Sequence, residues 1–217
     1  MEGHLRFTTN IRRSLRKQKC WDRIITEQTF SMLLANCTSQ IDKAGILASK
    51  AAHTGDWLNA SPITSIGLRM SNETIRVAVG LRLGAKLCEP HQCTCGALVH
   101  ARGLHDLSCR RSAGRHARQN LLNDTIWRAL NKAGVQSTKE PTGLLRSDGK
   151  RPDGVTLIAW ARERCLTWDV TVPDTLATSH IASTSYLPGA AAEHAATLKK
   201  QKYASLSQTH EFVPLAI

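Results

Sequence analysis

The chain has 217 residues, a formal net charge of +12 at pH 7 and 41% hydrophobic residues, enough for a folded core. The positive charge points to an anionic partner, nucleic acid first and an anionic membrane surface second, although a solvated basic surface has the same composition. No apolar run approaches the roughly 20 residues of a spanning helix, and the N-terminus lacks the apolar segment of a secretory signal, so we expect an intracellular protein.

The first part of the chain is predicted to be helical. Residues 1–52 show a helical apolar pattern that basic residues interrupt, and residues 72–86 predict a further helix. Between them, residues 55–70 are rich in turn-forming types. We therefore expect residues 1–87 to form a helical connector region.

A cluster of metal-binding residue types follows. The seven cysteines are an odd number, and four of them lie within residues 88–109. In a reducing compartment such clustering indicates metal ligands rather than disulfides. Thiolate and imidazole are the ligands that Zn²⁺ prefers, and four protein ligands make a closed structural site. The predicted zinc ligands are Cys93, Cys95, His105 and Cys109. Cys88, His91 or His100 are alternative ligands, and a group of buried free thiols is the alternative interpretation.

The remaining chain predicts alternating helices and strands. Residues 112–134 form an amphipathic helix, with apolar residues on one face and a polar stripe of His116, Asn120 and Asp124 beside it. A short strand over 135–141 and a loop over 143–152 follow. Residues 189–206 predict a second helix, and residues 210–217 a last strand. This order predicts an α/β fold.

A hairpin carries the two acids of most interest. Residues 154–160 and 165–172 are rich in β-forming types and are separated by a charged turn at 161–164. If the hairpin centres on Arg162, Asp169 pairs with Val155, and Asp153 shares a face with Asp169. A slip of one residue would separate the two acids onto opposite faces.

Two carboxylates on one face of a basic protein suggest a hard cation. Mg²⁺ takes one or two carboxylates, with waters and phosphate oxygens as its other ligands. Such an ion would activate water for attack on a phosphodiester. In the alternative interpretation, Asp153 caps a turn and Asp169 pairs with Arg162 or Arg164.

The motif order resembles a known family. The segments KRPDG and WDVTV are similar to the catalytic core of the PD-(D/E)xK nucleases, which have a restriction-endonuclease-like fold. Together with CTCG, GLHDLSC, RHARQN, KEPTG and KKQKY, they resemble the C-terminal region of non-LTR retrotransposon polyproteins over residues 55–217. In these polyproteins, a Cys-Cys-His-Cys knuckle precedes the nuclease.

The resemblance implies a domain plan and a fold. Residues 88–112 would form the zinc knuckle, and residues 113–217 a nuclease domain with a mixed sheet flanked by helices, truncated at its C-terminus. It also implies a nuclear enzyme that uses Mg²⁺ to nick target DNA. The chain departs from the polyproteins because it has no reverse transcriptase.

A second departure concerns the catalytic lysine. The usual lysine position, two residues after the second acid, holds Thr171. The retrotransposon branch has its lysine on a following helix, which makes Lys199 and Lys202 the candidates, with Tyr203 beside them. Both lysines also fit the basic end of a helix that binds phosphate without specificity. Asp124 or Glu140 is a possible third acid at the metal, and either is as readily a surface residue.

Three functions remain open from the sequence. The chain is a Mg²⁺-dependent DNA endonuclease, a zinc-knuckle protein that binds DNA or RNA with a decayed nuclease site, or a transposon remnant without a role. The first two have the same electrostatic requirement, since phosphate contacts dominate nucleic-acid affinity. The basic residues expected to contribute are Arg12, Arg13, Arg16, Lys17, Arg110, Arg111, Arg115 and Arg118.

Overall fold

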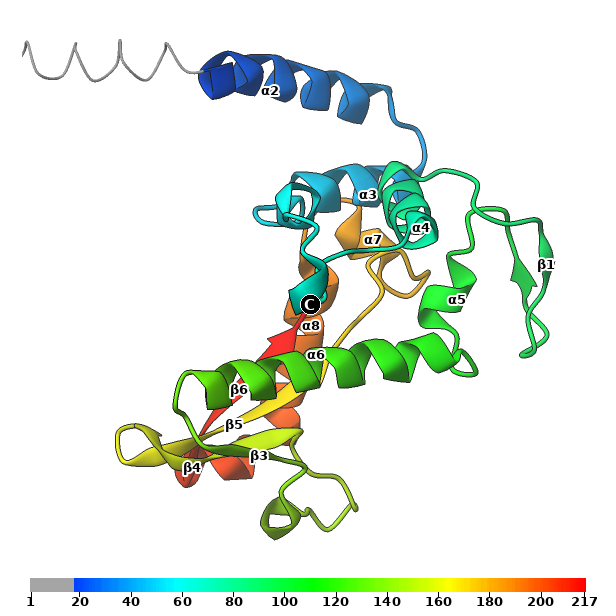
Figure 1. Ribbon diagram of the computed structural model, residues 1–217. Helices are drawn as coiled ribbons and strands as arrows, with labels where there is room; N and C mark the ends of the chain where they lie inside the picture. The colour runs from blue at the N-terminus through cyan, green and yellow to red at the C-terminus, as the bar shows by residue number, and fades with distance from the viewer. Residues whose placement is uncertain (1–17) are drawn as a thin grey trace, which may run out of the picture.

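A computed structural model describes residues 18–217 of the chain (Figure 1). The four N-terminal basic residues Arg12 to Lys17 therefore lie outside the described residues. The helical first region consists of α2 (Gln18–Asn36), α3 (Gln40–Lys50), the short 3₁₀ helices η1 (Asp56–Asn59) and η2 (Thr64–Ile66), and α4 (Asn72–Leu83). Residues 1–52 were expected to be helical, and the described part of this segment forms two helices that are separated at 37–39, where Ser39 caps the second helix by accepting a hydrogen bond from the Asp42 amide.

The cysteine-rich segment forms a small separate unit. Strands β1 (His91–Gln92) and β2 (Leu98–Val99) pair antiparallel, and the single-turn helix α5 (His105–Ser108) follows. Its strands are two residues each, so hydrogen bonds alone would hold it weakly. The stability of this unit therefore depends on contacts between side chains.

The C-terminal half is a mixed α/β unit, as the sequence predicts at this level. Helix α6 (Ala113–Lys132) precedes three strands, β3 (Ser137–Lys139), β4 (Gly154–Ala161) and β5 (Arg164–Thr171). A short 3₁₀ helix, η3 (Thr142–Leu144), lies between β3 and β4. Helix α7 (Ile181–Thr184), helix α8 (Ala190–Lys202), the 3₁₀ helix η4 (Ala204–Gln208) and strand β6 (His210–Ala216) follow.

The sheet is ordered β3-β4-β5-β6, with β5 and β6 parallel and the other pairs antiparallel. Helix α6 packs on β3 and β5, and α8 packs on β5 and β6 (Figure 1). Trp168 bonds to α6 and its neighbour Asp169 bonds to α8, so the two helices cover opposite faces of β5. Asp169 is 2% exposed, so the polar face expected at this position is in fact buried under a helix.

The register of the hairpin differs from the predicted one. Val155 pairs with Thr167, and the predicted pairing of Val155 with Asp169 is therefore wrong. Two irregularities in β4 cause the difference, since Ala161 pairs with Arg164 at the turn while Gly154 pairs with Trp168 at the far end. Relative to the predicted pairing the shift is two residues, which keeps Asp153 and Asp169 on one face.

A glycine makes this register possible. A Cβ atom on Gly154 would lie 2.0 Å from Cζ2 of Trp168. The indole ring of Trp168, which is 1% exposed, thus packs directly over the backbone of its cross-strand partner. Only glycine leaves room for the indole ring, so the packing of Trp168 requires a glycine directly after Asp153.

The three regions pack against one another. Helix α7 of the C-terminal half contacts α3, and Arg102 beside the knuckle forms an ion pair with Asp42 of α3. Arg82 of α4 donates hydrogen bonds to the carbonyls of Thr54 and Ser49. Within residues 18–217, no helix has the length and apolar character needed to cross a membrane.

Candidate metal centre and acidic site

The cysteine-rich unit brings four ligand types together. One ligand atom from each of Cys93, Cys95, His105 and Cys109 lies within 4.8 Å of the others, and this cluster could hold a metal ion. Sγ of Cys93 is 3.6 Å from Sγ of Cys109, and Sγ of Cys95 is 3.2 Å from Nε2 of His105. Tetrahedral zinc with bonds of about 2.3 Å to sulfur sets two sulfur ligands roughly 3.8 Å apart. The arrangement is compatible with structural zinc.

Local backbone geometry places these ligands. The amide of Cys93 donates to Ala97 O and that of Gly96 to Cys93 O, at 2.9 and 2.8 Å, which folds the Cys93–Cys95 segment into a tight turn. Gly96 has φ of 89°, a value that favours glycine. Arg111 donates to Thr94 O at 2.7 Å and holds this turn against the start of α6.

Electrostatics distinguishes the thiols. A hydrogen bond from the Cys95 amide, aided by the Cys95, Cys109 and His105 side chains, lowers the pKa of Cys93 to about 6. At Cys109 the Arg111 amide favours the thiolate, but burial and the neighbouring Cys93 and Cys95 together raise the pKa. Crowded thiols resist simultaneous ionisation, and a divalent cation relieves that repulsion.

The alternative ligands do not join the cluster. The thiol of Cys88 is directed at the carbonyl oxygens of His100 and Ala101, and Nδ1 of His91 lies 2.9 Å from Glu89 O. In the part of the chain that the structure describes, the only group of three or more Cys, His, Asp or Glu side chains close enough for a metal ion is the cluster of Cys93, Cys95, His105 and Cys109.

The acidic site centres on Asp169, on the α8 side of β5. Nζ of Lys199 lies 2.5 Å from Oδ1 of Asp169, and Nζ of Lys202 lies 3.8 Å from Oδ2. Both lysines are on α8 three residues apart, so one helix face presents them to the same carboxylate. Asp169 does not pair with Arg162 or Arg164, which contact Glu211 and Ser207 O instead.

Asp153 approaches Asp169 from the adjacent strand. Its backbone amide donates to Trp168 O at 2.9 Å, and its Oδ2 accepts a hydrogen bond of 2.7 Å from the Val170 amide. The side chain is thus attached to β5 at the residue after Asp169. Burial and the negative charge of Asp169 raise the pKa of Asp153, against the opposing Val170 hydrogen bond and the Lys199 charge. The strand register and the hydrogen bond from Val170 place the Asp153 carboxylate beside Asp169.

Tyr203 completes the surroundings of the lysines. It is fully buried, its hydroxyl donates to Arg151 O at 2.7 Å, and it accepts a hydrogen bond of 2.8 Å from Nζ of Lys202. Burial, followed by the proximity of Asp169, raises the pKa of Tyr203, so its hydroxyl stays protonated. Tyr203 therefore links the end of α8 to the segment just before Asp153.

The proposed third acids are engaged elsewhere. Asp124 pairs with Lys139 at 2.5 Å, and that ammonium lowers the pKa of Asp124. Glu140 pairs with Arg151. Among residues 18–217, neither joins Asp153 and Asp169 in a three-acid group. A metal role for Asp124 or Glu140 stays a prediction that this arrangement does not favour.

The sequence reasoning missed the polar residues that fix the acidic site. Gln119 donates to Val170 O at 3.1 Å, and Asn123 donates to Asp153 O at 3.3 Å while accepting from Nε1 of Trp168 at 2.8 Å. Trp127, four residues further, donates to Ser137 O at 2.9 Å. The i, i+4, i+8 spacing of Gln119, Asn123 and Trp127 could have indicated that these three side chains share one face of the helix. The polar stripe that the sequence suggested, His116, Asn120 and Asp124, is shifted from it by one position.

The basic residues around the knuckle divide into two pairs. Arg111 and Arg118 donate to backbone carbonyls, those of Thr94 and Leu107, and so have structural roles. Arg110 and Arg115 are exposed. Arg110 and Arg115 are therefore better placed for an external anion than the other pair.

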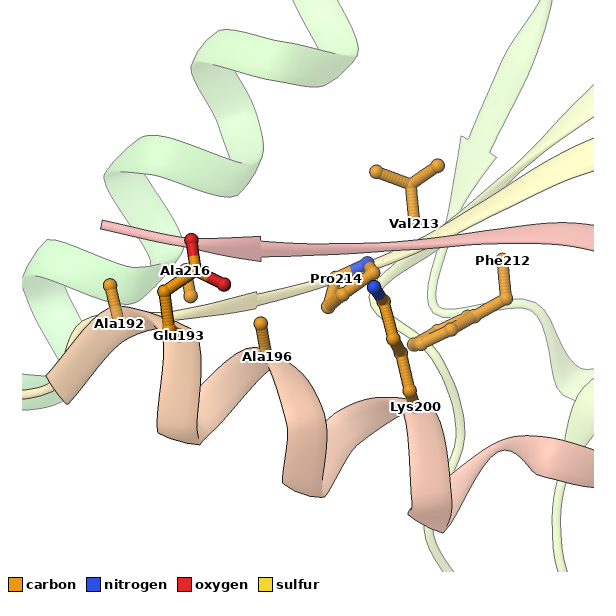
Figure 2. Close-up of a pocket in the computed structure, with 8 residues that line it drawn as sticks. All are labelled: Ala192, Glu193, Ala196, Lys200, Phe212, Val213, Pro214 and Ala216. Atoms are coloured by element: carbon orange, nitrogen blue, oxygen red, sulfur yellow. The ribbon is translucent and has the colours of Figure 1, made fainter. Parts of the chain in front are cut away.

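A cavity of about 380 Å³ lies between α8 and β6, next to the acidic site but separate from it (Figure 2). The alanine side chains of Ala192 and Ala196 point from α8 toward the strand, and Lys200 extends past Phe212 (Figure 2). Lys200 thus lines this cavity, while its neighbour Lys199 reaches Asp169. The two adjacent lysines have different environments.

Comparison with known proteins gave no match. No family model matches the chain, and neither a curated protein nor a solved structure does.

Proposed function

We propose that the protein is a retrotransposon-derived, metal-dependent endonuclease that nicks DNA in the nucleus. The observation that carries the proposal is the convergence of Asp153, Asp169 and Lys199 at the centre of a mixed sheet. The four-stranded mixed sheet with α6 and α8 on its two faces supports a restriction-endonuclease-like fold for residues 113–217. The basic net charge supports a nucleic-acid substrate.

In this proposal, Asp153 and Asp169 hold Mg²⁺. The raised pKa of Asp153, caused by burial and by Asp169, supports it, since a cation relieves the repulsion between two neighbouring carboxylates. When bound, Mg²⁺ supplies positive charge at the scissile phosphate and lowers the pKa of water.

The lysines have a separate role in the proposed reaction. Lys199 donates to Asp169 and carries a fixed positive charge beside both acids. It neutralises charge that develops on the phosphate oxygens in the transition state. Lys202, which is held by Tyr203, approaches the same carboxylate from the end of α8. Asn123 and Gln119 keep the two strands in register and so orient both acids.

The cysteine-rich unit would bind zinc for structure only. Four protein ligands would complete a tetrahedral zinc site and leave no position for substrate. Bound zinc would hold α5 and the β1–β2 hairpin to the start of α6, which continues into the acidic site through Gln119 and Asn123.

A nicking assay tests the proposal. Wild-type protein with supercoiled plasmid and Mg²⁺ is expected to produce open circles, and Asp169→Asn or Asp153→Asn to slow this by roughly 100-fold or more. Glu193→Gln is the matched control, because Glu193 is an exposed acid on α8 that lines the cavity in Figure 2. Equal rates for wild type and Asp169→Asn would overturn the proposal.

One observation favours a second function, nucleic-acid binding without cleavage. Both oxygens of Asp169 already contact lysines, so the carboxylate is neutralised without a metal. In this case, plasmid binding persists in wild type and Asp169→Asn, and neither protein nicks the DNA at any Mg²⁺ concentration.

A further inference from the structure

The loop between η3 and β4 brings further cations to the lysines of α8. The guanidinium carbon of Arg146 lies 5.6 Å from the ring centroid of Tyr203, and Nζ of Lys202 lies 4.4 Å from the same centroid. The charges of Lys199 and Lys150 both lower the pKa of Lys202, after burial as the main cause. Arg146 and Lys202 therefore share one ring at the edge of the acidic site, and Lys150 lies in the same turn as Arg146.

This loop is a built turn rather than an exposed charged run. The amides of Arg146 and Gly149 donate to Lys150 O and Arg146 O, at 2.9 and 3.0 Å. Asp148 accepts hydrogen bonds from Nε of Arg146 and the amide of Lys150. At the end of the turn, the hydroxyl of Tyr203 donates to the carbonyl of Arg151. The backbone of the turn and the guanidinium of Arg146 are thus held in place before any ligand binds.

The turn has more positive charge than its own acid neutralises. Asp148 is the acid that contacts Arg146, and it occupies only Nε, which leaves the terminal nitrogens of the guanidinium for an external acceptor. The side chain of Arg146 is 31% exposed and that of Lys202 is 25% exposed. Lys150 is exposed. Arg146 and Lys202 are therefore both held in place and accessible, and Lys150 adds an accessible charge in the same turn.

We propose that Arg146, Lys150 and Lys202 bind a backbone phosphodiester of a nucleic acid, next to the phosphodiester that Asp153 and Asp169 act on. The inference rests on the proposed function, which places the phosphodiester that is cleaved at Asp153 and Asp169. A guanidinium fork and two ammonium groups match the oxygens of a phosphodiester, with the Tyr203 ring as a platform that orients Arg146 and Lys202.

The test measures binding of a short DNA duplex as a function of salt, in buffer without added divalent cations. The double variant Arg146→Gln/Lys150→Gln is expected to bind roughly tenfold more weakly near 0.1 M salt and to reduce the slope of log K against log salt by about 1 to 2. Arg162→Gln is the control, since Arg162 lies at the hairpin turn, roughly 30 Å along β4 from Asp153. It is expected to bind like wild type.

A double variant with the affinity and salt slope of wild type would overturn the inference. If inorganic phosphate then binds wild type and not the double variant, the site takes free phosphate only. The measurement needs no cleavage, so a wild type that fails to nick DNA removes the proposed function without deciding this result.

Discussion

Nζ of Lys199 lies 2.5 Å from Oδ1 of Asp169, a carboxylate that is 2% exposed. A buried carboxylate without its cation is strongly destabilising. The ion pair therefore has a structural role in addition to the catalytic role that we propose, and the two can be separated by experiment.

Lys199→Met is expected to lower the free energy of unfolding by about 3 kcal/mol or more, because it leaves Asp169 buried beside a weaker partner. Lys200→Met is the matched control, since Lys200 is adjacent on α8 but lines the cavity in Figure 2, and it should change stability by less than about 0.5 kcal/mol. Urea denaturation measures both. The double variant Lys199→Met/Asp169→Asn should recover part of the lost free energy of unfolding. A double variant as unstable as Lys199→Met would contradict a direct ion pair between Lys199 and Asp169.

Asp153 is expected to make stability depend on pH. Its folded pKa is raised above the ordinary value of 3.8, so the native state holds more protons than the unfolded state above that pH. Stability contributed by this group is complete below 3.8 and decreases as pH rises through the folded pKa. Asp153→Asn removes this decrease and should be more stable than wild type at pH 7 without divalent ions. Melts between pH 4 and 7 test this, and parallel profiles for both proteins would contradict it.

Mg²⁺ is expected to make wild type more stable than Asp153→Asn. A ligand that binds only the native state adds stability that grows with its concentration. Wild type should therefore be stabilised by Mg²⁺ in a melting experiment, while Asp153→Asn and Asp169→Asn should respond little. Glu193→Gln serves as the control for a general effect of ionic strength and should respond as wild type does. Equal shifts in all four proteins would argue against a site at these acids.

The cysteine-rich unit is expected to contain one zinc ion per chain by elemental analysis. Cys109→Ser and His105→Asn should lose it, because each removes one of four ligands. Cys88→Ser is the control, since the thiol of Cys88 faces backbone carbonyls and not the cluster. Acidification should release the metal, because protons compete with it for the thiolates. Full zinc content in Cys109→Ser would exclude this ligand set.

Gly154→Ala is expected to lower stability by about 1–3 kcal/mol, because its methyl group would overlap the Trp168 ring. Gly143→Ala is the matched control, as nothing lies within 4 Å of a Cβ there. Thermal melts compare the two variants. A Gly154→Ala protein as stable as wild type would show that the ring moves aside without strain.

Much of the fold could be predicted because local patterns carry it. The alternation of β5 and the turn residues before it locate the hairpin, and the apolar periodicity locates α6. The ligand types and spacing of Cys93, Cys95, His105 and Cys109 also predict the one group of three or more Cys, His, Asp or Glu side chains that lie close enough to hold a metal ion within the described residues. These features depend on neighbours in sequence, whose geometry the backbone fixes.

Other features depended on contacts between distant segments. The pairing of Val155 with Thr167 follows from irregularities in β4, which no local pattern indicates. Asp169 is buried because α8 covers it, and Lys199 rather than Lys200 reaches it because of how that helix is rotated against the sheet. The sequence by itself determined which chemical groups are present and on which elements. Only tertiary packing decided which of them meet, because helix rotation and strand register are set by the burial of surfaces far apart in the chain.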